Sequence, residues 1–198
     1  MDRLWTPWRY SYITGADSAS NVDSDKPSRP GVPRALAGWP EENDHHCVFC
    51  NLIGAVEWAI SSGMSAEEAE RAGNVILRGP HTFTCLNAFP YSSGHVLIVP
   101  YRHVASLAEL DEATAGEIIL TAQRLETALR GVYRPDGINM GLNLGQAAGA
   151  GVAGHVHMHV LPRWFGDTNF MTVTAETRVL PELLEATWNR LREELARS

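Results

Sequence analysis

The sequence predicts an α+β fold, with a mainly antiparallel five-stranded sheet, one long helix and a C-terminal helix. Short runs rich in β-branched residues follow one another directly, and Gly- and Pro-containing turns separate them. Apolar residues at helical spacing are segregated into other parts of the chain, as in α+β rather than α/β proteins. The 198 residues, of which 44% are hydrophobic and 20% charged, are enough to bury one compact core.

The β-rich runs define the expected strands, because adjacent runs joined by tight turns favour antiparallel pairing. The runs lie at residues 74–78, 82–87, 95–99, 138–144 and 155–163, with a last short one at 170–174.

Three segments are expected to be helical. Residues 65–72 begin with a Ser cap and contain good helix formers. From Leu107 to Leu129, apolar residues recur at three- and four-residue steps, which predicts a long helix ending near Arg130, before Pro135. The C-terminal helix is expected to start at Pro181, since proline suits a first helical turn.

The chain divides into three parts by composition. Residues 1–16 form an aromatic arm, whose Trp and Tyr side chains we expect to pack on the body or on a partner subunit. Residues 17–44 contain four prolines among Ser, Asp and Gly, which predicts a linker or loop. Residues 45–198 form the folded domain.

Composition also limits the partners and the compartment. A formal net charge of −7 argues against a protein that binds a polynucleotide backbone through a basic face. No apolar run is long enough to span a membrane, and the first residues lack the pattern of a signal peptide. Three cysteines, an odd number, fit a reducing compartment, so we expect a cytoplasmic protein.

The most informative stretch is Gly-His-Val-His-Met-His-Val-Leu-Pro at residues 154–162. On a strand, His155, His157 and His159 point to one face, while the apolar residues between them point to the core. A metal-binding row is an alternative interpretation. In a row of imidazoles on a stiff strand, one ring can also act as a nucleophile while its neighbours orient it and transfer protons.

This run resembles the signature of the histidine triad family of nucleotide hydrolases and transferases, His-φ-His-φ-His-φ-φ with φ apolar. The resemblance covers about residues 47–164, because residues 86–90, 94–100 and 143–154 are similar to the family's ribose-binding strand end, adjoining strand and phosphate loop. It implies a histidine triad fold and cleavage of a nucleotide at its α-phosphate through a covalent nucleotidyl-histidine.

The resemblance also implies a role for each histidine. His157 is the nucleophile, held by a hydrogen bond from its other ring nitrogen to a backbone carbonyl near His155. His159 contacts the phosphate or the leaving group and assists proton transfer.

The resemblance further implies a set of nucleotide-binding residues. Some of these residues have a purely structural role as an alternative. Asn87 is then a turn residue, the Gly/Ala-rich loop a flexible connection, and Trp164 a core residue. Gly151 and Val152 stand where many members have Gln-Ser/Thr, which leaves room for an acceptor larger than water. The set is Asn87, His95, Asn143, Gly149, Gly151, Val152 and Trp164.

Cys47 and Cys50 have the spacing of two thiolates in a hairpin on a tetrahedral zinc ion. In the zinc-bearing branch of the family the remaining ligands correspond to His103 and His155, so the resemblance implies a closed, structural zinc site. His45 and His46 are alternative ligands.

The sequence therefore predicts a nucleotide-processing enzyme. The opening Leu-Trp-Thr-Pro-Trp-Arg and the phosphate loop look most like bacterial family members that process diadenosine tetraphosphate, as hydrolases or phosphorylases. A nucleotide-binding regulatory module with little turnover and a nucleoside phosphoramidase are the alternatives. The long apolar helix, the aromatic arm and the family's two-fold symmetry predict a homodimer.

Overall fold

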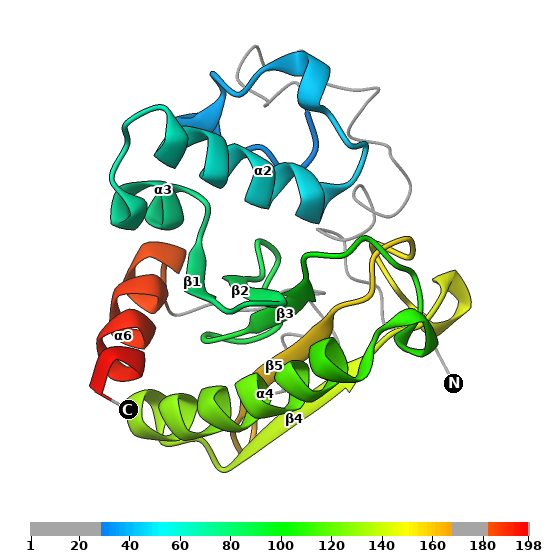
Figure 1. Ribbon diagram of the computed structural model, residues 1–198. Coiled ribbons are helices and arrows are strands. Elements are labelled where there is room, and N and C mark those ends of the chain that lie inside the picture. Colours follow the sequence, from blue (N-terminus) through cyan, green and yellow to red (C-terminus); the bar gives the residue numbers. More distant parts are fainter. Residues whose placement is uncertain (1–28, 168–181, 198) are drawn as a thin grey trace, which may run out of the picture.

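The computed structural model describes residues 29–167 and 182–197 (Figure 1). Its centre is a five-stranded antiparallel sheet in the order β1-β2-β3-β5-β4. This confirms the predicted fold class. The strands are β1 (Val75–Arg78), β2 (Thr82–Leu86), β3 (Val96–Pro100), β4 (Gly137–Leu142) and β5 (Met158–Arg163).

Helices cover both faces of this sheet (Figure 1). One face packs against α2 (Val48–Ser61) and α3 (Ala66–Ala72), and the other against α4 (Glu112–Tyr133) and α6 (Leu184–Arg197). Alternate residues of one strand enter different cores: Leu97 and Val99 face α2, whereas Val96 and Ile98 face α4. β2 and β3 are buried along their whole length, because both of their faces are covered.

The long helix is shorter at its start than its apolar pattern suggested. Leu107–Glu109 forms a separate 3-10 turn, and α4 begins after Asp111, whose carboxylate accepts a hydrogen bond from the Thr114 amide at 2.8 Å. Such a cap satisfies an amide that the helix leaves unpaired. α4 ends at Tyr133, where Arg134 takes a left-handed conformation before Pro135.

Two other boundaries move by a few residues. The predicted strand at 155–163 is regular only from Met158, so His155 and His157 lie in the segment that leads into β5. α6 begins at Leu184 rather than at Pro181. The predicted strand at 170–174 and the aromatic arm at 1–16 lie outside the described residues.

Helix α2 was not predicted, although Phe49, Ile53 and Val56 have helical spacing. The interpretation of Cys47 and Cys50 as part of a hairpin is therefore wrong. Cys47 is the N-cap residue of α2, and Cys50 lies in its first turn.

The described part of the predicted linker is packed onto the core. Residues 29–44 contain two 3-10 turns, Arg34–Leu36 and Glu41–Asn43. Leu36 and Trp39 are 2% and 3% exposed and belong to the same core cluster as α2. Apolar side chains between the prolines therefore make this segment part of the folded unit.

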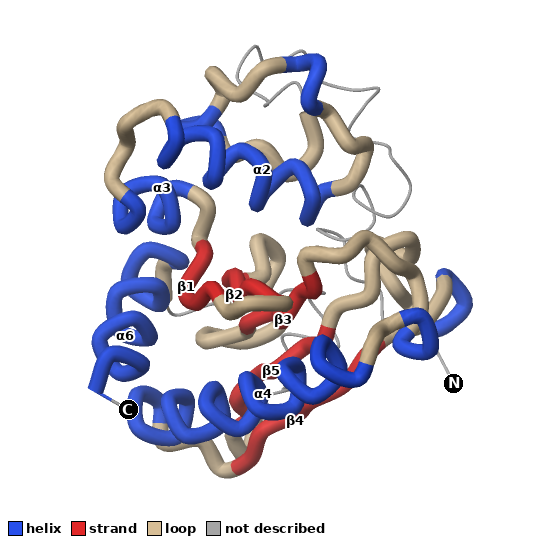
Figure 2. The backbone as a smooth tube through the Cα atoms, in the orientation of Figure 1, coloured by secondary structure: helices blue, strands red, loops and turns tan. Residues whose placement is uncertain are grey.

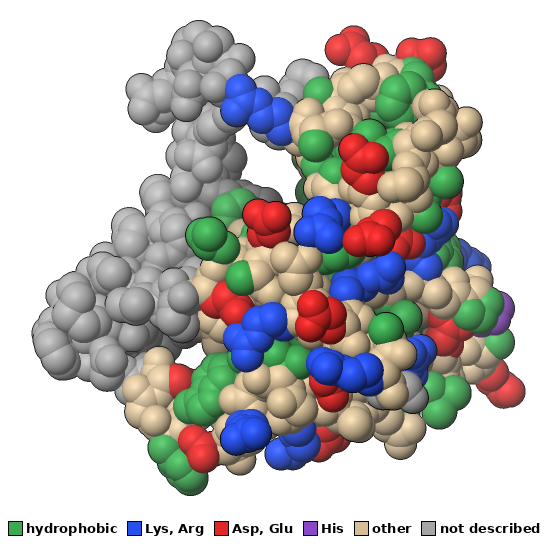
Figure 3. Space-filling model, turned by 90° about the vertical axis from the view of Figure 1, so that its left-hand side faces the viewer, with side chains coloured by type: hydrophobic (Ala, Val, Ile, Leu, Met, Phe, Trp, Pro, Cys, Tyr) green, Lys and Arg blue, Asp and Glu red, His purple; other side chains and the backbone are tan. Residues whose placement is uncertain are grey.

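The surface carries charges of both signs. On the face shown in Figure 3, Arg and acidic side chains are interspersed. Ion pairs among the described residues include Arg192 with Glu70 at 3.1 Å and Arg78 with Glu57 at 2.7 Å. Among the described residues, no helix is long and apolar enough to cross a membrane.

Burial of Leu36 gives a test of whether residues 29–44 belong to the folded unit. Leu36→Ala should lower the free energy of unfolding by about 2–5 kcal/mol, because it removes buried methyl groups and leaves a cavity. Urea denaturation measures the change, with Ala35→Ser at the neighbouring exposed position as the control. A Leu36→Ala variant as stable as the control would show that the segment is a true linker.

Candidate active site and metal centre

The triad histidines lie on the α2 side of the sheet. In β5, Met158 and Val160 enter the core beneath α4, so His157 and His159 face the opposite way. His159 pairs with Leu97 in the register between β3 and β5. The predicted alternation of histidine and apolar residues therefore holds, although the regular strand begins only at Met158.

His157 is held in one tautomer. Its Nδ1 lies 2.8 Å from the backbone carbonyl oxygen of His155, and a carbonyl can only accept, so Nδ1 carries the proton. Nε2 is then left with a lone pair. Burial lowers the pKa of His157 below its usual value, while the hydrogen bond to the His155 carbonyl opposes this shift. The ring is therefore neutral at pH 7, as a nucleophile requires.

His159 is oriented by His95, which lies beneath it and is 1% exposed. The Tyr91 amide donates to His95 Nδ1 at 3.1 Å, so the His95 proton is on Nε2. That Nε2–H donates to His159 Nδ1 at 3.0 Å. In the neutral ring the proton of His159 is consequently on Nε2, where it can be donated to a ligand.

A pocket opens in front of His157 and His159, between α2 and the sheet, and we call it the triad pocket. Its walls are mostly apolar, which suits a flat aromatic ring next to a few polar groups. The lining residues are Val48, Phe49, Leu52, Cys85, Leu86, Asn87, Ala88, Phe89, Leu97, Gly151, Val152, His157 and His159.

Some of the predicted nucleotide-binding residues line this pocket, and others do not. Asn87, Gly151 and Val152 belong to the lining. Asn87 also fits its structural reading, because its Oδ1 accepts the Phe89 amide at 3.0 Å within the turn.

Four predicted residues lie outside the lining. His95 is a buried support beneath His159, and Asn143 and Gly149 belong to the loop that leads to the triad. Gly149 has a φ of +87°, which favours glycine whether or not a ligand is near. Trp164 follows β5, is partly buried, and packs edge-on against Tyr133 with ring centroids 6.3 Å apart.

The four predicted metal ligands lie together beside the triad. Cys47, Cys50, His103 and His155 present ligand atoms that all lie within 4.8 Å of one another. Cys47 Sγ and Cys50 Sγ lie 3.3 Å and 3.6 Å from His155 Nδ1, and Cys50 Sγ lies 3.3 Å from His103 Nδ1. Tetrahedral zinc at ordinary bond lengths places sulfur and nitrogen ligands about 3.6 Å apart. The four residues can therefore hold a metal ion.

Two hydrogen bonds prepare this cluster. His155 Nε2 donates to the Pro100 carbonyl at 2.9 Å, which leaves Nδ1 unprotonated and directed at the sulfur atoms. The Val156 amide donates to the Val104 carbonyl at 2.7 Å. This bond joins the segment that follows β3 to the segment that precedes β5, and Figure 2 draws both as loops. His45 and His46, the alternative ligands, are not part of the cluster that the described residues form.

The sequence analysis missed the residues that α2 contributes to the pocket. Val48, Phe49 and Leu52 line it, and the Phe49 ring lies 4.8 Å from that of His157. Their spacing is that of one helix face, which is the signal in the sequence that indicates them. Tyr91 was also missed, and no sequence signal identifies a backbone amide as a donor to His95.

Comparisons with known proteins identify the family of this chain. The model of the HIT domain family matches residues 68–166. A protein from Mycobacterium tuberculosis named AP-4-A phosphorylase is 34% identical over 197 residues, which cover 100% of this chain and 86% of that protein. The chain belongs to the HIT domain family, and it is a nucleotide hydrolase or phosphorylase.

Solved structures support the same family. The crystal structure of a Zn-bound histidine triad family protein from Mycobacterium smegmatis has a TM-score of 0.55 and 28% identity, covering 76% of this chain and 94% of that chain. A histidine triad nucleotide-binding protein from Sulfolobus tokodaii has a TM-score of 0.56 over 76% of this chain and 93% of its own. Its 24% identity supports the likeness of fold.

Proposed function

We propose that this enzyme cleaves a dinucleoside polyphosphate such as diadenosine tetraphosphate at an α-phosphate. The observation that carries the proposal is the fixed His157 tautomer, which presents a neutral Nε2 at the triad pocket. The full-length similarity to a protein named AP-4-A phosphorylase favours this substrate class and inorganic phosphate as the acceptor. Water as acceptor, giving a hydrolase, is the second candidate.

In the proposed first half-reaction, the Nε2 lone pair of His157 attacks the α-phosphorus. The bond to the bridging oxygen breaks, and His159 Nε2–H donates its proton or a hydrogen bond to that leaving oxygen. The His155 carbonyl stabilises the positive charge that develops on the His157 ring, because it accepts the Nδ1–H bond.

In the second half-reaction, an acceptor oxygen attacks the nucleotidyl-histidine and frees His157. Gly151 and Val152 line the pocket here without polar side chains, so they leave space for a phosphate ion. The preceding loop contains a 3-10 turn, Gln146–Ala148, between two glycines with positive φ. Its backbone amides are suited to contact phosphate oxygens.

Product analysis tests this proposal directly. Diadenosine tetraphosphate with inorganic phosphate should yield ADP and ATP, whereas hydrolysis would yield AMP and ATP. Release of AMP from a nucleoside phosphoramidate alone would indicate a phosphoramidase. Absence of product from either substrate would favour the regulatory binding module and contradict the proposal.

The role of His157 gives a sharp prediction. His157→Ala should lower kcat by at least about a thousandfold and leave the fold intact by circular dichroism, because it removes the covalent nucleophile. Steady-state kinetics measure the loss, and His81→Ala, at an exposed histidine outside the pocket, is the control. Retention of more than about a tenth of the wild-type kcat would exclude His157 as the nucleophile.

We also propose that the metal held by Cys47, Cys50, His103 and His155 is zinc, since two thiolates and two imidazoles form a closed site typical of structural zinc. When bound, zinc would join the start of α2 to the segments that carry the two histidines. All three cysteines are free, which fits a cytoplasmic protein.

The zinc assignment predicts a metal content of about one zinc per chain in protein purified without chelator. Cys50→Ser should lower both the zinc content and the melting temperature, because it removes a ligand from the closed site. Elemental analysis and calorimetry measure these changes. Cys85→Ser changes a buried cysteine outside the cluster and should keep its zinc. Equal zinc content in both variants would exclude Cys50 as a zinc ligand and contradict the proposed site.

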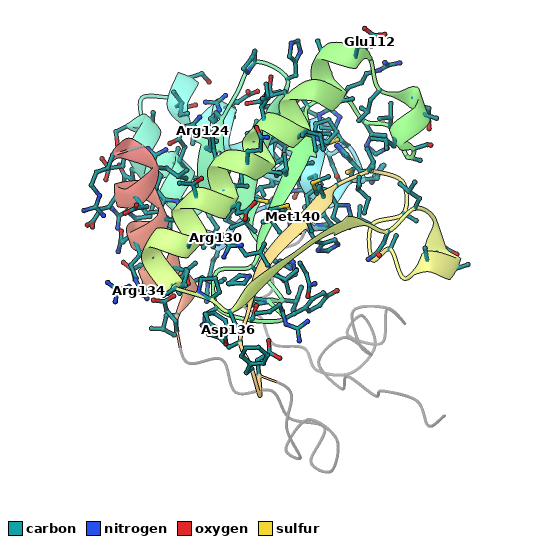
Figure 4. All side chains as sticks on the ribbon, turned by 90° about the horizontal axis from the view of Figure 1, so that it is seen from below. Glu112, Arg124, Arg130, Arg134, Asp136 and Met140 are labelled. Carbon is teal, nitrogen blue, oxygen red and sulfur yellow. The ribbon has the colours of Figure 1, made fainter. Side chains whose placement is uncertain are left out.

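A homodimer is the third part of the proposal. β4 forms an edge of the sheet, and its residues 139–141 are exposed. Met140 is 41% exposed, and on α4 the exposed fractions of Ile119 and Leu120 are 54% and 62%. Figure 4 labels Met140, which belongs to β4 at the edge of the sheet. An open strand edge beside exposed apolar side chains favours pairing with a second copy.

The proposed dimer should dissociate when charge is placed on this surface. Met140→Asp combined with Leu120→Asp should produce monomers at micromolar concentration, because two carboxylates would have to be desolvated in the interface. Sedimentation velocity measures the state. Leu183→Asp, at a leucine that is 78% exposed on another part of the surface, should remain a dimer. A wild-type protein that sediments as a monomer would contradict the proposal.

A further inference from the structure

The two residues between the cysteines of the metal cluster are also walls of the triad pocket. Val48 and Phe49 follow Cys47 directly, precede Cys50, and both line the pocket. They belong to the first turn of α2, the turn that supplies both sulfur ligands. The same backbone turn therefore serves the metal cluster and the pocket.

The Phe49 ring contacts both the metal cluster and the histidine triad. It meets the ring of the metal-cluster residue His155 edge-on, with centroids 5.5 Å apart, and it lies 4.8 Å from the ring of His157. Phe49 is only 5% exposed. A displacement of the first turn of α2 would therefore move a buried ring against the proposed nucleophile and the pocket at the same time.

The cluster also joins α2 to two segments that adjoin the sheet. Cys47 and Cys50 lie at the start of α2, whereas His103 follows β3 and His155 precedes β5. A four-coordinate ion held by all four residues would fix these segments to one another. It would thereby constrain the first turn of α2, which contributes Val48 and Phe49 to the pocket.

The side-chain hydrogen bonds of this turn lead away from the pocket. Asn51 donates to the Pro30 carbonyl at 2.9 Å and to the Asp44 carboxylate at 2.7 Å. The Cys47 side chain makes no capping hydrogen bond to α2. These hydrogen bonds tie α2 to residues 30–44, and the packing of Phe49 is what joins the turn to the triad segment.

We propose that metal binding at the Cys47–Cys50–His103–His155 cluster raises the affinity of the triad pocket for a nucleoside, with Phe49 as the positioning residue that couples the two sites. The inference rests on the proposed function, because it takes a nucleotide as the ligand. Coupling is reciprocal, so nucleotide binding must raise the affinity for the metal by the same factor.

Titration calorimetry with AMP tests the coupling in metal-loaded and metal-free protein, with adenosine as a second probe that has no phosphate to bind the metal. Metal removal should weaken binding by about tenfold in the wild type. In Phe49→Ala, which already lacks the positioned ring, metal removal should weaken binding less than about threefold. Phe89→Ala changes an aromatic residue of the pocket outside α2 and should retain the full tenfold effect.

A second measurement needs no metal-free protein. Co²⁺ bound in place of zinc has thiolate absorption bands that report its ligand geometry. Saturating AMP should shift these bands in the wild type and in Phe89→Ala, but not in Phe49→Ala. If Phe49→Ala fails to fold, Phe49→Leu replaces it and should show a reduced shift.

The outcomes separate this inference from the proposed function. Equal AMP affinity with and without metal, or an equal loss in the wild type and in Phe49→Ala, would overturn the coupling and leave the proposed function intact. Failure of the metal-loaded wild type to bind either AMP or adenosine would overturn both. A kcat that falls on metal removal while KM is unchanged would also contradict the coupling, because the metal would then act on the chemical step.

Discussion

The backbone carbonyl of His155 is the group on which the site depends. It accepts the Nδ1–H of His157 at 2.8 Å and so decides which nitrogen of that ring is available to a ligand. The side chain of the same residue is directed at two cysteines and is fixed by the Pro100 carbonyl at 2.9 Å. His155 therefore links the metal cluster, through its side chain, to the proposed nucleophile, through its backbone carbonyl. A displacement of the His155 backbone would change the position of both groups.

Much of this arrangement follows from the sequence because it depends on local periodicity. Alternation along residues 155–160 places His157 and His159 on one face whatever the rest of the fold, since successive side chains of an extended chain point to opposite sides. The spacing of Cys47 and Cys50 has the same local character, as it brings two sulfur atoms together in a helical turn as well as in a hairpin. Local geometry explains why Cys47 and Cys50 were identified as a pair of ligands although helix α2 was not, whereas His103 and His155 were predicted from the family resemblance.

The features that escaped prediction depend on tertiary contacts. Trp164 follows the triad in sequence, but its ring packs against Tyr133 and it is not among the residues that line the triad pocket. Residues 29–44 have the composition of a linker, and only the burial of Leu36 and Trp39 shows that they are packed. Phe49 reaches His157 because α2 lies across the sheet, a position that helical spacing alone does not specify.

A neutral imidazole nucleophile imposes two requirements that compete. The ring must be buried, because burial lowers its pKa and keeps the lone pair free, yet Nε2 must face an open pocket. The structure meets the first requirement with Phe49 from α2, leaving His157 5% exposed, and the second with the gap between α2 and the loop at Gly151 and Val152. Packing against Leu97 and Val99 holds α2 on the sheet. A metal ion at the proposed cluster would add a second constraint at the first turn of α2, where Phe49 lies against His157.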